Sequence, residues 1–185
     1  MKRVLAAYWE DMPTSLRYDR IIAAGTSRRA AALFMCSNLP YLAVALLFGC
    51  HPELRLPQAA GALCGRREPY VLASTAMFLV SSFMHLTQLQ CGCGCWGTMS
   101  ERSEIRLKQA DVACVLTMIA VPVVCAQSLL PAWYVAPCLP LFVVSQHYKI
   151  AGRAHLYLVW HSVWHVATAA AAWFYVTQHW VAVGS

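Results

Sequence analysis

Long apolar segments constrain this chain more than any other feature of its sequence. They lie at about 30–49, 70–90, 108–129, 132–148 and 155–178. A helix needs roughly 20 apolar residues to cross a hydrocarbon core of about 30 Å, and most of these segments reach that length. Of the 185 residues, 59% are hydrophobic and only 12% are charged, a balance outside that of ordinary soluble domains. We therefore predict an all-α integral membrane protein, a bundle of about five transmembrane helices.

The five segments form one predicted transmembrane domain, residues 30–185, preceded by a different kind of segment. Residues 1–29 mix basic and apolar side chains, which favours an amphipathic segment at the membrane surface. The fourth span is the least regular, because it is short and contains Pro137 and Pro140. Proline kinks a helix or marks one that packs against neighbours.

The basic residues predict how the chain is oriented. Five spans place the N-terminus, the loop at 91–107 and the loop at 149–154 on one side of the membrane. With the start of the third span, that side carries eleven Lys and Arg residues, against three (Arg55, Arg66 and Arg67) on the other. The positive-inside rule then places the N-terminus in the cytosol or in the mitochondrial matrix. This orientation also explains the net charge of +6, and no basic stripe with interleaved aromatic residues indicates a nucleic-acid partner.

Polar residues inside the spans indicate a functional site, because ionisable groups are costly there. Ser81 and His85 are four residues apart on the second span, Asp111 stands at the head of the third, and His161 and His165 are four apart on the fifth. Residues four apart share one face of a helix. Each pair therefore presents its side chains in one direction.

The span count predicts that these side chains converge. His85 lies about five residues before the end of its span, and His161 about five residues after the start of its own. At ~1.5 Å per residue, both are roughly 8 Å below the same membrane surface. The third span begins at that surface with Asp111. Three imidazoles meeting at one depth would form a nitrogen site suited to Zn²⁺ with an open water position.

In such a site Asp111 and Ser81 would act on the water. The carboxylate would accept its proton, and the hydroxyl would hold the water or donate to a developing oxyanion. Simpler interpretations stand beside this one. Each histidine could be a hydrogen-bonded packing residue, and Asp111 could be an acid favoured by the helix dipole. Haem is an alternative, but it usually needs ligands that face each other from opposite helices. A di-iron site would require more histidine clusters, and His51, His147, His155 and His179 form none.

The joint pattern Ser81-x-x-x-His85, Asp111, His161-x-x-x-His165 resembles that of the CREST superfamily. This group includes alkaline ceramidases, adiponectin and progestin receptors, GPI-remodelling lipases and myomaker-like proteins. The resemblance covers roughly residues 70–178. It implies a seven-helix membrane fold in which three histidines hold zinc. It also implies that the acid and the serine activate water for hydrolysis of a lipid amide or ester.

This chain departs from the family pattern in three ways. It has five predicted spans, so two helices between Asp111 and His161 are absent. A gap of 25 residues separates His85 from Asp111, although a helix starting at Ser100 or Ser103 would still carry Asp111 about 15 Å inward. The connection before that helix contains Cys91, Cys93 and Cys95 in "CGCGCWG". These thiols could be palmitoylated, could bind a metal, or could be incidental in a flexible turn.

Two functions are therefore expected as alternatives. The first is a zinc-dependent membrane hydrolase acting on a ceramide-like amide or a phospholipid ester, with membrane lipid as its partner. The second is a non-catalytic structural subunit of a larger membrane complex, in which zinc is a staple between helices. A receptor or fusion role is implied only by the resemblance. The resemblance favours the endomembrane system (ER or Golgi), with the mitochondrial inner membrane as the alternative.

Overall fold

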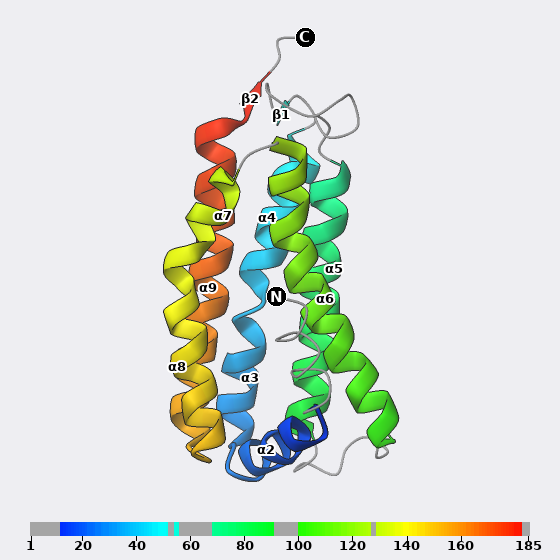
Figure 1. Cartoon of the computed structure of the whole chain (residues 1–185), viewed down its shortest axis with the longest axis vertical. Coiled ribbons are helices and arrows are strands. Elements are labelled where there is room, and N and C mark those ends of the chain that lie inside the picture. The colour runs from blue at the N-terminus through cyan, green and yellow to red at the C-terminus, as the bar shows by residue number, and fades with distance from the viewer. Residues whose placement is uncertain (1–11, 52–53, 56–67, 91–99, 127–128, 183–185) are drawn as a thin grey trace.

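The computed structural model describes residues 12–51, 54–55, 68–90, 100–126 and 129–182, and most of them are helical (Figure 1). The helices are α2 (Met12–Ala24), α3 (Arg28–Cys36), α4 (Leu39–Cys50), α5 (Glu68–Gln90), α6 (Glu101–Ala126), α7 (Leu130–Val135), the 3₁₀ turn η1 (Ala136–Cys138), α8 (Leu139–Ile150) and α9 (Ala154–His179). Two short strands, β1 (Leu54–Arg55) and β2 (Val181–Ala182), pair antiparallel. The chain is thus a helical bundle, as predicted.

Three helical stretches in the described residues are long and apolar enough to cross a membrane: Arg28–Cys50, Glu68–Leu89 and Glu101–Cys125. They correspond to the first three predicted spans. The fourth predicted span is divided into α7, η1 and α8, because prolines interrupt it. The fifth matches α9, which has 26 residues but is not among these three stretches. The five-span arrangement therefore remains a prediction.

The third helix begins before its predicted span. The span is predicted to begin at about residue 108, and α6 begins at Glu101, next to the alternative starts at Ser100 and Ser103. Ser100 precedes it and accepts a hydrogen bond from the backbone N–H of Ser103, as an N-cap residue does. Asp111 consequently lies ten residues inside α6, or about 15 Å along its axis.

The first predicted span is also not one continuous helix. It is divided between α3 and α4 at Ser37 and Asn38. Pro40 lies in the first turn of α4, where its missing N–H costs nothing but where it cannot continue a preceding helix. Ser37 therefore lies in the short break between α3 and α4, inside the bundle.

A tight turn joins α8 and α9 and determines how these helices face each other. Gly152 adopts a φ of 67°, in the left-handed region that favours glycine. The N–H of Gly152 donates to the carbonyl of Lys149, and the N–H of Arg153 donates to that of Tyr148. These two bonds form a Schellman motif at the end of α8. The turn places α8 antiparallel to α9, in extensive contact with it.

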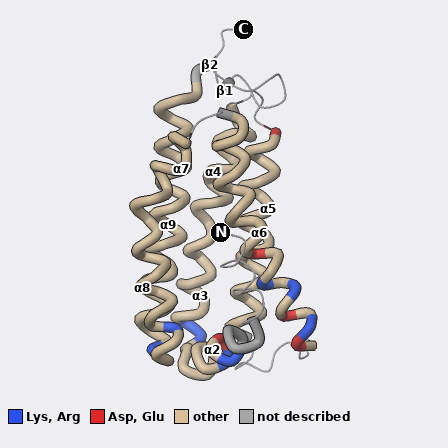
Figure 2. The backbone as a smooth tube through the Cα atoms, viewed as in Figure 1, with Lys and Arg blue, Asp and Glu red and all other residues tan. Residues whose placement is uncertain are grey.

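The short helix α2 lies across one end of the bundle, where it contacts α5, α6, α8 and α9 (Figure 1). Lys and Arg residues gather at this same end (Figure 2). The inner side of α2 buries Asp19 and Ile22, whereas Arg17 and Arg20 are exposed. α2 is the described part of the predicted surface segment, and residues 1–11 lie outside the described chain.

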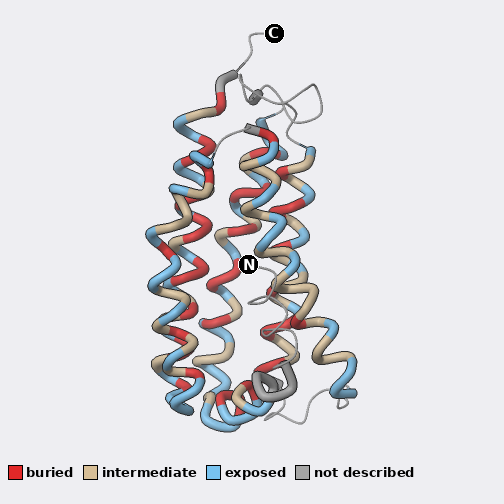
Figure 3. Tube along the Cα trace, in the orientation of Figure 1, coloured by how far each residue is buried: buried red, intermediate tan, exposed pale blue. Residues whose placement is uncertain are grey.

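Most of the apolar core lies at the opposite end. Its largest cluster includes Phe48, Tyr70, Tyr175, Val176 and Trp180, from α4, α5, α9 and the residue after α9. Buried positions follow the inner side of α9 along its length, whereas α6 is mainly half-buried or exposed (Figure 3).

Candidate metal centre

Three histidines from two helices meet in the interior of the bundle. His85 of α5 and His161 and His165 of α9 are buried, and their ligand nitrogens, one from each ring, all lie within 4.8 Å of one another. The ring centroids are 5.2 Å apart for His85 and His161, 5.1 Å for His85 and His165, and 4.7 Å for His161 and His165. The predicted convergence of the three side chains is therefore confirmed. In the described residues, this is the group that could hold a metal ion.

The hydrogen bond to His165 determines which of its nitrogens carries the proton. Its Nδ1 lies 2.8 Å from the hydroxyl oxygen of Ser37, at the break between α3 and α4. Ser37 donates its only hydroxyl proton to the carbonyl of Phe34, 2.6 Å away. Its oxygen must then accept from His165 Nδ1–H. Nε2 of His165 is left with a lone pair, as a metal ligand requires.

His161 has the same arrangement with a different serine. Its Nδ1 lies 3.1 Å from the hydroxyl oxygen of Ser145 on α8, and Ser145 donates its proton to the carbonyl of Phe142. The oxygen of Ser145 therefore accepts from His161 Nδ1–H. The α8–α9 turn makes this contact because it places Ser145 opposite His161.

His85 is held by an amide instead of a hydroxyl. Its Nδ1 lies 3.0 Å from Oε1 of Gln88, one turn further along α5. The amide nitrogen of Gln88 donates to Asp19 Oδ1 at 2.9 Å and to the hydroxyl of Tyr157 at 3.3 Å. Oε1 is therefore the acceptor that faces His85, and His85 is also protonated at Nδ1.

All three rings thus present an unprotonated Nε2. The Nε2 atom of His85 is buried and has no hydrogen-bond partner, which costs free energy unless something else binds it. A second interaction that orients each ligand ring through its other nitrogen is usual at protein metal sites. The donor set, its burial and this vacant nitrogen fit a divalent cation that accepts imidazole.

Phe34 of α3 covers one side of the group. Its ring centroid lies 4.6 Å from that of His85, 5.7 Å from His161 and 5.9 Å from His165. Phe34 itself is 1% exposed, so this side is closed to water and lipid. The ring of Tyr41 lies 5.9 Å from His165 on another side.

Asp111 and Ser81 lie beside the histidines, as the sequence predicts. Asp111 is close enough to His85 for an electrostatic interaction and close enough to Ser81 for a side-chain hydrogen bond. Ser81 Oγ and Asp111 Oδ1 are both buried, and the contact between the two residues falls outside ideal hydrogen-bond geometry. A carboxylate and a hydroxyl thus lie together on the His85 side of the group.

Several residues that the sequence did not single out surround the centre. Ser37, Ser145 and Gln88 orient the imidazoles, and Asp19 orients Gln88. Asp19 also forms buried ion pairs with Lys108, at 2.7 Å, and with Lys149. Gln88 could have been found in the sequence from its spacing of three residues after His85, which places it on the same helix face. The two serines, Ser37 and Ser145, are marked in the sequence only as polar residues within apolar runs.

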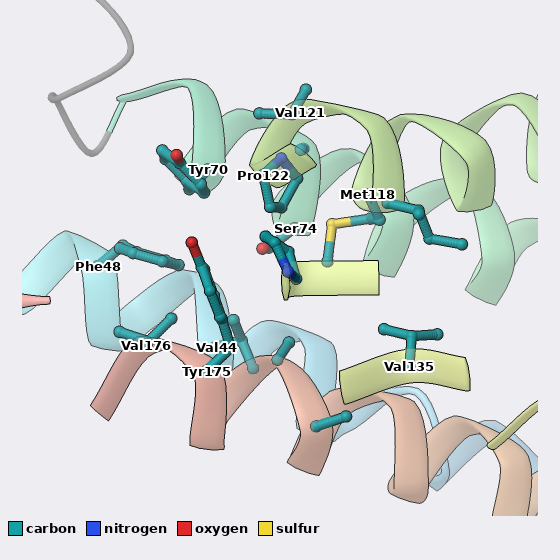
Figure 4. A pocket seen from close by; sticks show the side chains of 15 residues that line it. Val44, Phe48, Tyr70, Ser74, Met118, Val121, Pro122, Val135, Tyr175 and Val176 are labelled. Atoms are coloured by element: carbon teal, nitrogen blue, oxygen red, sulfur yellow. The ribbon is translucent and has the colours of Figure 1, made fainter. Parts of the chain in front are cut away.

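Two apolar cavities lie between this centre and the other end of the bundle. One cavity of about 50 Å³ is lined in part by Tyr41, Trp164 and Thr168, close to His165. A second cavity of about 50 Å³ has Ser74 and Tyr175 in its lining (Figure 4). The two share the lining residues Met118, Ile119, Val135 and Ala172. The two cavities therefore adjoin beside α6.

The cysteines at 91, 93 and 95 lie outside the described residues, so their palmitoylation or metal binding remains a prediction. No protein-family model, no curated protein and no solved structure matches this chain. The resemblance to the CREST superfamily therefore stands on the pattern of Ser81, His85, Asp111, His161 and His165.

Proposed function

We propose that this protein is a zinc-dependent membrane hydrolase that cleaves a lipid amide or ester, built on a five-span version of the CREST fold. The observation that carries the proposal is the convergence of the three imidazoles. One ligand nitrogen from each ring lies within 4.8 Å of the others, and the carboxylate of Asp111 lies close to His85. Three histidines with an open fourth position are the ligand set of many catalytic zinc sites.

His85, His161 and His165 would hold the zinc ion, which would supply a water molecule of lowered pKa and polarise a carbonyl group. Asp111 accepts a proton from the water that adds to the acyl carbon. Ser81 donates a hydrogen bond to the developing oxyanion. When the C–N or C–O bond breaks, Asp111 returns the proton to the departing amine or alcohol, so that a fatty acid and a free amine or alcohol result.

The two apolar cavities beside α6 support a lipid substrate. A chain of methylene groups lying among Met118, Val135 and Ala172 would bring its carbonyl end toward the histidines. In this proposal the basic, α2 end of the bundle faces the cytosol or matrix, in an endomembrane or in the mitochondrial inner membrane.

Metal analysis and turnover of the purified full-length protein test the proposal. We expect one zinc ion per chain, lost in His161→Ala, and release of fatty acid from a short-chain ceramide or a phosphatidylcholine in mixed micelles. Asp111→Asn should keep the zinc and lose the turnover. Absence of stoichiometric zinc from the wild-type protein would contradict the proposal.

A second function is favoured by the poor coverage of α6. In its most apolar stretch, 6% of residues are buried, against 39% in each of the other two candidate spans. A structural subunit whose α6 packs against another membrane protein would show such exposure, with zinc as a staple between α5 and α9. Stable co-purification with partner proteins, together with stoichiometric zinc and no lipid turnover, would favour this function over hydrolysis.

A further inference from the structure

The three histidines are oriented by different parts of the molecule. Ser37 and Ser145 each donate to a backbone carbonyl three residues earlier in the chain. Each serine is therefore positioned by its own segment. Gln88 is different, because its amide is held by side chains from two other helices, Asp19 of α2 and Tyr157 of α9.

Asp19 is itself held firmly by other helices. It is 5% exposed, and its carboxylate contacts Lys108 of α6, Lys149 of α8 and Gln88 of α5. The position of this carboxylate therefore depends on α2 being docked across the end of the bundle. Charge-assisted hydrogen bonds of this kind are shorter and stronger than neutral ones.

The path from α2 to the metal centre has only two steps. The carboxylate of Asp19 accepts from the amide nitrogen of Gln88, and the amide oxygen of Gln88 accepts from Nδ1–H of His85. The amide is planar, so holding its nitrogen end also determines the direction of its oxygen. If Asp19 were withdrawn, Gln88 could rotate, and His85 would lose the partner that selects its tautomer.

We propose that Asp19 and Gln88 are positioning residues for His85, and that docking of α2 thereby controls the metal affinity of the centre. This inference rests on the metal centre of the proposed function but does not require hydrolysis. It assigns the N-terminal helix a role that the spacing of the histidines does not indicate. Because His161 and His165 have their own serines, loss of α2 docking should act on one of the three ligands.

Zn²⁺ and Co²⁺ titrations of the full chain in detergent test the inference. Gln88→Met removes the acceptor for His85 but leaves the ion pairs of Asp19 intact. We expect it to weaken zinc binding about 10- to 100-fold, as loss of a supporting partner does at other sites. It should also change the visible absorption of the Co²⁺ form, which reports the ligand geometry. Asp19→Asn should weaken binding less, by about tenfold, because Gln88 remains present.

Glu104→Gln is the matched control. It removes the exposed ion pair between α2 and α6, in which Arg20 and Glu104 are 3.4 Å apart, without touching the path to His85. Such a pair contributes little, so zinc affinity should change by less than about twofold. Gel filtration and circular dichroism check that each variant keeps its fold. If Asp19→Asn does not fold, Gln88→Met alone decides the outcome.

A metal-free measurement separates this inference from the proposed function. In the wild-type protein with ¹⁵N-labelled histidine, the signal lost in His85→Ala should show protonation at Nδ1, and in Gln88→Met that signal should change tautomer. A wild-type protein that binds no zinc but shows this change contradicts the hydrolase and the control of metal affinity, and supports only the positioning of His85 by Gln88. Unchanged zinc affinity and an unchanged tautomer in Gln88→Met would overturn the inference.

Discussion

The two ends of the bundle are held together by different kinds of contact. At the α2 end, directed polar contacts join Asp19 to two lysines and an amide, and hydrogen bonds orient three imidazoles. At the other end, aromatic rings pack against one another. The ring centroid of Phe48 lies 5.2 Å from that of Tyr70 and 5.0 Å from that of Trp180. Packing tolerates small displacements, whereas hydrogen bonds fix direction. A site that needs well-defined ligand geometry is accordingly found at the polar end.

If this difference is correct, changes at the polar end should alter chemistry and changes at the apolar end should alter stability. Asp111→Asn should produce the largest effect of all. The amide cannot accept a proton, so we expect lipid turnover to fall about 10²- to 10⁴-fold, as for loss of a general base. Zinc content should be unchanged. Glu101→Gln, at an exposed position of the same helix, is the control and is assayed in parallel. Equal turnover by the two variants would contradict the role of Asp111.

Phe48→Ala tests the apolar end. Phe48 is 2% exposed and contacts two other aromatic rings. Its removal should lower the free energy of unfolding by about 3–5 kcal/mol, the usual range for a packed phenylalanine. Denaturation in detergent measures this, with Leu46→Ala as the control, because Leu46 is 56% exposed on the same helix. A large loss of zinc affinity in Phe48→Ala would show that the two ends are not independent.

His165→Ala tests the polar end, where we expect a loss of zinc affinity. In zinc-finger peptides, apparent binding energies of about 10–16 kcal/mol are shared among four protein ligands, so removing one ligand here should weaken binding roughly 100- to 1000-fold. His179→Ala is the matched control on α9, because His179 bonds to Tyr134 at the apolar end. Competition with a chromogenic chelator measures both variants. Similar zinc affinities for the two would remove His165 from the site.

Ser145→Ala should have the smallest effect of the four changes. It removes the acceptor of His161 Nδ1–H but no metal ligand, so we expect zinc affinity to fall about 10- to 100-fold. Thr177→Val is the control, since the hydroxyl of Thr177 also donates to a carbonyl of its own helix but contacts no histidine in the group. If both changes leave affinity unaltered, Ser145 does not orient the ring of His161.

Much of the site could be predicted because helical periodicity and span count act together. Their spacing of four residues places His161 and His165 on one face of α9. His85 is predicted to lie at the same depth in the membrane, so α5 is expected to face them. The partners of the rings could not be predicted in this way. Ser37 reaches His165 because the first span breaks between α3 and α4, and no spacing rule connects residues 37 and 165.

The buried charges show a second limit of sequence reasoning. Lys108 and Lys149 were counted as basic residues that orient the chain, and both do lie toward the α2 end. The structure buries them, however, at 5% and 4% exposed, against Asp19. Their burial depends on how α2 docks, which is a tertiary property. α6 begins before the predicted third span because its first two turns are charged and precede the apolar run.

The turn at Gly152 implies a strict limit on chain length between α8 and α9. Each residue added to or removed from a helix rotates the later part of that helix by about 100°. A single insertion between Ser145 and His161 would therefore swing the serine hydroxyl away from the imidazole, even if both helices remained intact. Homologous proteins that keep this centre should accordingly vary in the residues of this hairpin but conserve its number of residues.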